Sequence, residues 1–389
     1  MVIEFVGVFI MGKVVNKGLK LLILPDDDMI YVLEQNMGNA RFIWNNLLSM
    51  YMETYRLFSF HNCSLYPNIS NFNAMLNMLK QENHFLREGE STSQQQVYRD
   101  LVNAFNKFLK EGSGFPRFKS KKNTKQSFRI QKSGNNIRIT NRRIRLAKLG
   151  YVHYRTSSHY KKLLKNCKIN NVTVKRENGK YYAIVNIKTT VKELEKTNQN
   201  IGIDLGLKNL ATLSNGQEIA NLDLKKEETM VQKYQKILSR QKYMSKNYQK
   251  TLKKYYKWQD KKNNKIQNAY HQISKKIVTQ YDIIAMETLN IKGMFQNKRW
   301  AHKLQRISLY QLLKMLKYKA EWYGKKFIQI PRFYPSTKTC HICGYQNNNL
   351  TLDIRQMDMP ILQNTPQKRC KRSKKHTKQS NKNKYIKIY

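Results

Sequence analysis

Two apolar runs that each carry one carboxylate constrain the fold of this chain more than any other feature. In the first, Ile201-Gly-Ile-Asp-Leu-Gly-Leu-Lys-Asn-Leu-Ala-Thr-Leu213, Asp204 interrupts a strand-like pattern. Strand alternation places Asp204 on a face shared only with glycines, where a ligand can approach closely. A buried carboxylate needs a partner, usually a metal ion or a base. The alternative is an aspartate that ends the strand and caps the next turn.

The second run, Tyr281-Asp-Ile-Ile-Ala-Met-Glu-Thr-Leu-Asn290, ends its apolar stretch in Glu287. Hard cations take oxygen ligands, and two of them about 4 Å apart can activate water and stabilise the leaving oxygen of a phosphodiester. The sequence therefore predicts that Asp204 and Glu287 are catalytic ligands of Mg²⁺ or Mn²⁺. For two other acids, Asp282 and Asp353, we expect structural roles, because one opens its strand and the other lies near a zinc motif.

The charge of the chain indicates its partner. Its 389 residues include 73 Lys+Arg and 25 Asp+Glu, which gives a formal net charge of +48. Such an excess repels itself unless a polyanion is near, and nucleic acid is the usual one because neutralised phosphates release counterions. A ribosomal or histone-like scaffold protein would share this charge, but a chain this long is expected to form two or three domains with their own cores.

The apolar stretches and the cysteines argue against a membrane or secreted protein. The longest apolar stretch, residues 1–10, is interrupted by Glu4, is too short to span a bilayer and lacks a basic leading region. Met11 resembles a second start, so we expect residues 1–10 to be an upstream extension. Five cysteines in this length form no disulfide framework, and a cytoplasmic location with access to the host genome is expected.

The first half predicts a strand, a helical region and then a basic sheet. Residues 12–24 have strand character, and residues 29–109 follow a helical period, with Ser91-Thr-Ser-Gln94 as cap chemistry before the second helical face. Residues 127–190 alternate apolar with basic residues, which predicts a small β-barrel with one basic face.

A Gly/Pro break at residues 112–122 separates the helical region from these strands. It mixes aromatic rings with cations, a composition that suits a loop following a phosphate backbone. A solvated charged loop is the alternative. The candidate nucleic-acid contacts are Phe115, Arg117, Phe118, Lys119, Lys121 and Lys122.

The second half predicts helices around the two carboxylate strands and a zinc motif. Residues 225–277 are Lys-rich and predict a helical hairpin that turns near Ser245. An amphipathic helix is expected within residues 300–324, and a strand at 327–330. Cys340-His-Ile-Cys343-Gly is a zinc knuckle whose two thiolates supply half of a tetrahedral Zn²⁺ site.

The order of these motifs resembles the TnpB/OrfB family of insertion-sequence proteins, which is related to the type V CRISPR nucleases. The matching segments are IGIDLGLKNLATLSNG, YDIIAMETLNIKGM and FYPSTKTCHICG, with ARFIWNNLL, STSQQQVYRDLVNAFNKFL and GFPRFKSKK earlier in the chain. The resemblance covers residues 11–356. One departure precedes His271, where the family's Arg-x-Asp is Ile266-Gln-Asn268.

The resemblance implies a function as well as a fold. It implies an RNA-guided, metal-dependent DNA endonuclease that uses three acids and a four-Cys zinc ribbon, with guide RNA and target DNA as partners. The implied architecture is an α+β multidomain protein, in which a helical domain and a small β-barrel precede an RNase H-like (RuvC) nuclease domain with a zinc-ribbon insertion. The oligomeric state stays open.

The larger departure from the family lies at the C-terminal end. The family has a second Cys-x-x-Cys and then an Asp-x-Asn-Ala-Ala segment with the third acid, whereas residues 357–389 form a Lys-rich tail. When the codons from Met357 onward are read one base later, the Met-Asp and Met-Pro pairs force Trp and Cys. The other codons permit Trp-Thr-Cys-Pro-Tyr-Cys and a later Asp-Val-Asn-Ala-Ala. We interpret this tail as out of frame and expect little or no cleavage by the chain.

Alternatives follow from this interpretation. A frameshifted relic could bind RNA or DNA without cutting, and an accessory or regulatory DNA-binding protein of transposition is a related option. If the tail is in frame, Cys370 and His376 could complete the zinc site begun by Cys340 and Cys343.

The expected domains follow the motifs in chain order. They are an extension at 1–10, the first strand of the barrel at 11–28, a helical domain at 29–111, the basic loop and remaining barrel at 112–192, a RuvC-like domain with the hairpin at 198–332, a half zinc ribbon at 333–356 and the tail at 357–389.

Overall fold

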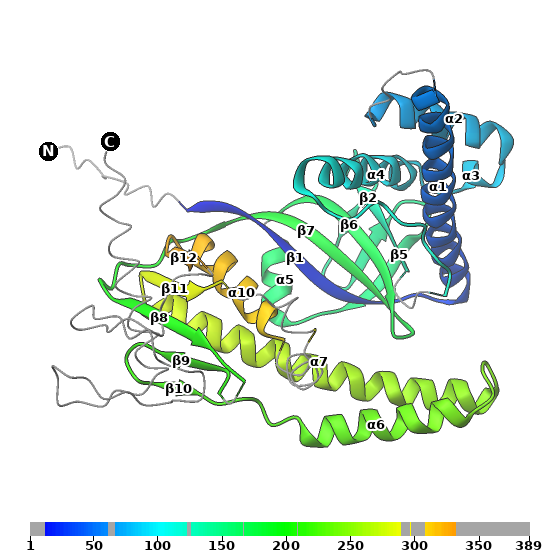
Figure 1. Ribbon diagram of the computed structural model, residues 1–389. Coiled ribbons are helices and arrows are strands. Elements are labelled where there is room, and N and C mark those ends of the chain that lie inside the picture. Colours follow the sequence, from blue (N-terminus) through cyan, green and yellow to red (C-terminus); the bar gives the residue numbers. More distant parts are fainter. Residues whose placement is uncertain are drawn as a thin grey trace, which may run out of the picture. The chain divides into compact units, whose positions relative to one another are not determined.

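The computed structural model describes residues 12–60, 67–122, 126–165, 167–207, 209–288, 296 and 308–331 (Figure 1). The chain separates into two compact units, one of residues 14–190 and one of residues 1–13 and 191–389. None of the helices in the described ranges is long and apolar enough to cross a membrane.

The first unit is built on one seven-stranded sheet. Its order is β2-β6-β7-β1-β5-β4-β3. The bounds are β1 Lys13–Leu24, β2 Gln126–Gln131, β3 Arg138–Ile139, β4 Arg143–Leu146, β5 Gly150–Arg155, β6 Lys168–Glu177 and β7 Lys180–Val191. The predicted strand at 12–24 is therefore confirmed, and it lies in the middle of the sheet although it comes first in the chain.

This sheet is a half-barrel rather than the closed barrel that the alternation predicts. Strands β2 and β3 stand at its two ends in the order of pairing. Helices supply the missing cover: α1 (Asp27–Phe60) and α4 (Ser91–Glu111) pack against β2 and against each other. Their apolar side chains share one hydrophobic core with those of the sheet. Because the helices bury the inner face, the strands have no need to close on themselves.

The helices of this unit follow the predicted periodicity. In α1, Leu33, Met37, Ala40, Trp44, Leu47 and Tyr51 are all buried. Three shorter helices complete the unit: α2 (Ile69–Glu82), α3 (Phe85–Glu88) and α5 (Ser158–Lys165). The cap of α4 differs from the prediction, because Glu90 fills that position. Its carboxylate accepts hydrogen bonds from the Ser93 amide at 2.5 Å and from the Thr92 hydroxyl at 2.8 Å.

The second unit contains a five-stranded sheet in the order β10-β9-β8-β11-β12. The strands are β8 Asn200–Leu205, β9 Ala211–Leu213, β10 Glu218–Ile219, β11 Ile283–Glu287 and β12 Lys326–Ile330. Strands β8, β9 and β10 form an antiparallel meander, while β11 is parallel to both β8 and β12. The second carboxylate strand therefore pairs directly with the first.

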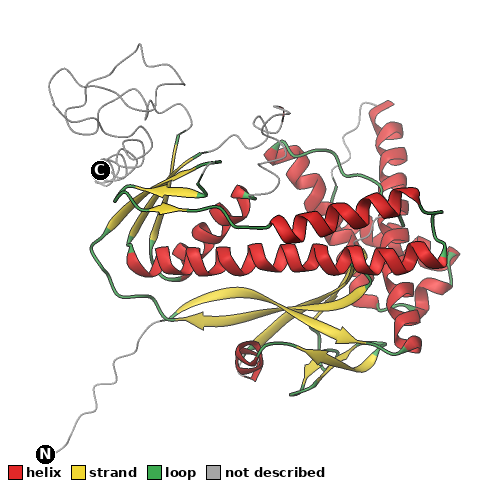
Figure 2. Ribbon diagram, turned by 90° about the horizontal axis from the view of Figure 1, so that it is seen from below, coloured by secondary structure: helices red, strands yellow, loops and turns green. Residues whose placement is uncertain are grey.

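Within the described residues, three long helices accompany this sheet. Helices α6 (Lys225–Arg240) and α7 (Lys246–Gln280) form the predicted hairpin and lie side by side (Figure 2). Ser245 caps α7 by accepting a hydrogen bond from the Tyr248 amide at 3.1 Å. Helix α10 (Leu309–Trp322) packs on α7, and β12 follows it. The predicted helix therefore begins at Leu309 within the described residues, and the strand at 327–330 is confirmed as part of β12.

Candidate functional site

Asp204 lies in the middle of the second unit's sheet. Strand β8 has β9 on one side and β11 on the other, and all of its residues from Ile201 to Leu205 are buried. The carboxylate residue is only 3% exposed. In the antiparallel register it stands opposite Thr212 of β9. The strand continues through Leu205 after Asp204, so the backbone of this aspartate is part of the ladder.

Glu287 is the last residue of β11 and is 7% exposed. The parallel register pairs Met286 with Ile203, so the next residue on each strand, Glu287 and Asp204, stand beside each other. Neighbours at one level of a parallel pair point to the same face, and the strands are about 4.8 Å apart. The fold thus brings together, at the carboxyl ends of two central strands, the two acids that the sequence singled out.

The donor set at this edge fits a hard divalent cation. Carboxylate oxygens are the ligands that Mg²⁺ and Mn²⁺ prefer, and two neighbouring carboxylates repel each other unless a cation lies near them. Within the described ranges, no group of three or more His, Cys, Asp or Glu side chains could hold a metal ion. The pair Asp204 and Glu287 is therefore the whole of the candidate cation site in that part of the chain.

The zinc ligands expected from the sequence, Cys340, Cys343, Cys370 and His376, lie outside the described residues, as does Asp353. The domains expected at 333–356 and 357–389 also lie outside the described residues. They stay predictions.

Asp282, the acid immediately before β11, joins neighbouring segments of the chain instead of facing the candidate cation site. Its carboxylate accepts hydrogen bonds from the Lys325 ammonium at 2.5 Å and from the amides of Thr197 and Asn198 at 2.9 and 2.6 Å. Lys325 is buried and also donates to the Glu195 carbonyl at 2.6 Å. Burial alone would raise the pKa of Asp282, but the bonds from Lys325 and from the two amides lower it to about 2. These contacts fasten the segment before β8 to the starts of β11 and β12.

We predict that Asp282→Ala lowers the free energy of unfolding by about 3 kcal/mol, because it leaves the Lys325 ammonium buried without its carboxylate. A depressed folded-state pKa contributes stability above the unfolded value, near 4, that is lost as the pH falls towards about 2. Urea unfolding at several pH values checks this. The unmutated chain should lose stability across that acid window, and the variant should lose less.

Glu195→Ala is the matched control, since it removes an exposed carboxylate from the same segment. Equal effects of the two substitutions would contradict the assignment of Asp282 as a structural anchor.

The basic loop at 112–122 is held from α1. The Trp44 indole donates to the Arg117 carbonyl at 2.9 Å, and the Asn45 side chain exchanges hydrogen bonds with the backbone of Lys119 at 3.0 and 2.7 Å. The Lys119 ammonium lies 3.7 Å from the centre of the Trp44 ring. The loop therefore has a defined backbone although it belongs to no helix or strand.

The six candidate contacts of this loop divide into two groups. Phe115 packs edge-on against Phe105 and Phe108, and Lys119 lies over Trp44, so both help to hold the loop. All six residues are exposed, with Phe115 at 43% and Phe118 at 57%, and the second group consists of Arg117, Phe118, Lys121 and Lys122. Nothing in the sequence distinguished the two groups, because the aromatic partners lie on two earlier helices, Trp44 on α1 and Phe105 and Phe108 on α4.

Lys319, like Lys325, is a buried cation that sequence reasoning missed. Lys319 of α10 is 8% exposed and donates to the His271 carbonyl at 2.7 Å and to the Ser274 hydroxyl at 2.8 Å. Burial lowers its pKa to about 8. Burial also lowers the pKa of His271, with a smaller contribution from Lys319. Lys319 thus joins α10 to α7 through its hydrogen bonds to His271 and Ser274. His271 is the histidine that follows the departure from the family's Arg-x-Asp.

Comparison with known families gives three matches along the chain. Residues 172–298 match a family described as "Probable transposase", residues 310–377 match "Cas12f1-like, TNB domain", and residues 11–57 match "Helix-turn-helix domain". In the last range this structure has strand β1 followed by helix α1.

Two relatives align with more than two thirds of the chain. A Streptomyces pristinaespiralis protein named "Putative RNA-guided DNA endonuclease" is 27% identical over 355 residues, which cover 89% of this chain and 85% of that protein. An Escherichia coli K12 protein named "Putative RNA-guided DNA endonuclease InsQ" is 28% identical over 281 residues, 68% of each chain.

One solved structure shares the fold. The chain in "Cryo-EM structure of the Cas12f1-sgRNA-target DNA complex" aligns with a TM-score of 0.50 and 15% identity, covering 84% of this chain and 77% of that one. The likeness supports the α+β multidomain architecture.

Proposed function

Because the chain belongs to the TnpB/OrfB family, which is related to the type V nucleases, we propose that it is built as an RNA-guided DNA endonuclease with guide RNA and target DNA as its partners. The observation that carries this proposal is the adjacency of Asp204 and Glu287 on two parallel, buried strands. The names of both relatives support the same activity.

The nuclease domain is proposed to be of the RuvC (RNase H-like) type. An antiparallel three-strand meander with two further strands parallel to its first strand supports this assignment. So does the placement of one acid in the first strand and one at the end of the fourth strand of this sheet. The domain boundaries given under the sequence analysis, including 198–332 for this domain, remain our proposal.

Asp204 and Glu287 are proposed to hold Mg²⁺ or Mn²⁺. When bound, such a cation supplies an activated water and charge stabilisation of the leaving oxygen. The residues of the chain contribute position: the sheet register is proposed to hold the two carboxylates at one level, while Ile203 and Met286, on the opposite face of the sheet, anchor the two strands in the hydrophobic core. Cys340 and Cys343 are proposed to bind structural Zn²⁺, in a stretch that matches the TNB domain.

Cleavage by this chain is proposed to be impaired. If residues 357–389 are out of frame, the chain lacks the family's third acid and its second pair of zinc thiolates. The competing proposal is a nucleic-acid-binding relic or accessory protein that does not cut. A cytoplasmic location, with access to the host genome, suits either function.

The loop at 112–122 is proposed as one nucleic-acid contact. Its backbone is fixed by Trp44 and Asn45, so the exposed Phe118, Lys121 and Lys122 are presented without a large loss of conformational freedom on binding. Aromatic side chains between cations are the arrangement used to stack bases while neutralising phosphates.

We predict strongly salt-dependent binding of structured RNA and DNA by the 389-residue chain, because the net charge of +48 releases counterions from the phosphates. Lys121→Ala with Lys122→Ala should weaken binding across sequences and reduce the slope of log affinity against log salt by about 1 to 2. Fluorescence anisotropy at several salt concentrations measures both quantities.

Lys162→Ala with Lys165→Ala is the control, since it removes the same charge from α5, away from the loop in sequence. An affinity that stays flat as salt rises would refute the polyanion interpretation. Equal losses in the two double variants would leave the loop without a special role.

A further inference from the structure

The distal half of the α6–α7 hairpin carries only positive charge. Between Glu228 and Asp260 there is no acidic residue, but there are nine cations: Lys233, Lys236, Arg240, Lys242, Lys246, Lys250, Lys253, Lys254 and Lys257. The buried residues of the 35-residue helix α7 begin only at Ile266. This part of the hairpin therefore contributes little to the core of its unit, and its charge suits a polyanion.

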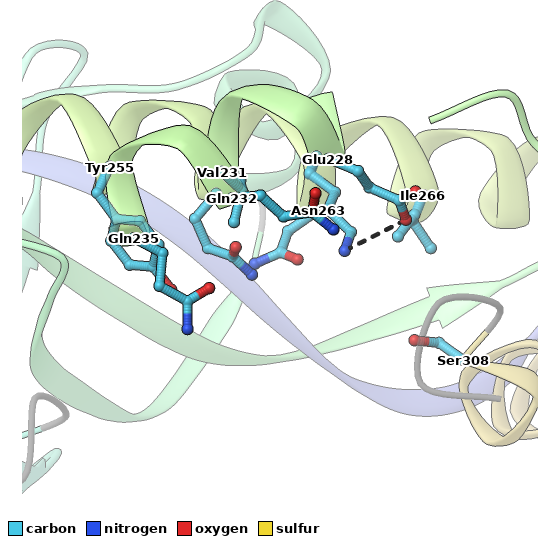
Figure 3. A pocket seen from close by; sticks show the side chains of 10 residues that line it. Glu228, Val231, Gln232, Gln235, Tyr255, Asn263, Ile266 and Ser308 are labelled. Carbon is cyan, nitrogen blue, oxygen red and sulfur yellow. Dashed lines mark ion pairs between the residues drawn. The ribbon is translucent and has the colours of Figure 1, made fainter. Parts of the chain in front are cut away.

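A pocket of about 410 Å³ opens between the two helices of this hairpin (Figure 3). Four carboxamides line it, two from each helix: Gln232 and Gln235 from α6, Gln259 and Asn263 from α7. The Tyr255 ring forms part of the wall, and Ser308 lies across from the helices. The volume is within the range of small-molecule sites, and the lining is mostly polar and uncharged.

The one pair of charges in the pocket wall is internally matched. The Lys262 ammonium lies 3.6 Å from the Glu228 carboxylate, and both side chains are mostly buried. The wall therefore carries no net charge, whereas the surface of the hairpin beyond it is cationic. This division suits a ligand with a neutral, hydrogen-bonding part and a charged backbone.

An unpaired nucleotide has that composition. Each carboxamide offers a donor and an acceptor next to each other, which complement the edge of a nucleobase, and a tyrosine ring can stack on its face. The phosphates on either side would meet the lysines of the hairpin. Paired bases cannot use these groups in the same way, because their edges are already hydrogen-bonded.

The topology sets the pocket towards the same end of the sheet as the carboxylate pair. Helix α7 leads into β11 through Tyr281 and Asp282, so Ile266, fourteen residues before Gln280, lies towards the carboxyl end of that strand. Helix α10 leads into β12, which is parallel to β11, so Ser308 at its start lies at this end as well. Asp204 lies one residue before the carboxyl end of β8, and Glu287 is the last residue of β11.

We propose that the pocket between α6 and α7 binds an unpaired nucleobase of a polynucleotide strand, with the cations of the hairpin holding the adjoining phosphates. The proposal rests on the proposed function, in that the strand is one that reaches Asp204 and Glu287. RNA and DNA share the chemistry that the pocket recognises, so both are compared in the test.

The test measures binding of a short single-stranded oligoadenylate and of its abasic counterpart, which has the same phosphates, to the 389-residue chain by fluorescence anisotropy. Both are used as DNA and as RNA. We expect the base-bearing strand to bind about tenfold tighter, as for stacking of one base. Gln232→Ala with Asn263→Ala should remove that advantage and leave the abasic affinity within about twofold, because phosphate contacts are retained.

Two matched substitutions make the result specific. Asn264→Ala removes an exposed carboxamide from the next position of α7, outside the pocket, and should leave both affinities unchanged. Tyr255→Phe should keep the base advantage, whereas Tyr255→Ala should lose it, because the ring and not the hydroxyl stacks.

The outcomes separate this proposal from the proposed function. If the unmutated chain binds base-bearing and abasic strands equally, or if the double variant retains the advantage, the pocket proposal is overturned while nucleic-acid binding stands. If the chain binds neither strand, the proposed function fails as well. The form with the larger base advantage, RNA or DNA, identifies the strand that enters the pocket.

Discussion

Restoring the other reading frame after Gln356 is expected to convert a chain with little or no DNA cleavage into a Mg²⁺-dependent nuclease. The restored protein regains the expected third acid beside Asp204 and Glu287, and two thiolates to complete the zinc site of Cys340 and Cys343. We expect a gain of at least about a thousandfold in cleavage rate, since about 4 kcal/mol of barrier corresponds to that factor. The measurement compares both proteins on a guide-matched duplex with Mg²⁺ and guide RNA.

Zinc content provides the second readout of this comparison. The restored protein should bind one Zn²⁺ through four thiolates, and the chain as written should bind it weakly. Equal cleavage by the two proteins would refute the frameshift interpretation and point to Cys370 and His376 as zinc ligands, with a third acid still to be found.

Replacing either carboxylate of the pair is expected to abolish cleavage by the restored protein. Asp204→Asn and Glu287→Gln keep the size of each side chain and remove its charge, so the fold should survive while a hard cation loses a ligand. We expect at least about a thousandfold loss of rate for each, and weaker Mg²⁺ binding by the 389-residue chain. Cleavage assays and calorimetric Mg²⁺ titration measure the two effects.

Asp223→Asn is the control, because it neutralises an exposed carboxylate of the same unit. Thermal unfolding in metal-free buffer separates catalysis from structure. A large drop in melting temperature for Asp204→Asn, without a change in Mg²⁺ affinity, would mean that Asp204 stabilises the sheet and does not bind metal.

Local pattern was enough to predict much of the second unit. The apolar run around Asp204 corresponds to β8 and β9, the run that ends in Glu287 to β11, and the helical period of residues 225–277 to α6 and α7. In each segment the spacing of apolar residues shows which side chains are buried, and that spacing can be read from the sequence alone. That the two acids stand beside each other is a matter of sheet register, which no local pattern contains.

Features that depend on distant partners could not be predicted. The sheet stays a half-barrel because α1 and α4 pack on it. The sequence of the strands alone does not reveal that helices will bury this face. Lys319 is buried because α7 supplies two oxygen acceptors, and Asp282 is an anchor because Lys325 reaches it from forty-three residues away. The pocket of the hairpin depends likewise on how the faces of α6 and α7 meet.

The register between β8 and β11 has a consequence for how the length of such chains can vary. Side chains alternate between the faces of a strand, so one residue inserted into Ile283–Met286 would turn Glu287 to the opposite face from Asp204. The turn between α6 and α7, residues 241–245, is under no such constraint, since the cost of a longer connection grows only slowly with its length. Relatives should therefore gain and lose residues at the tip of the hairpin, around Tyr243 and Met244, while the two strands keep their length.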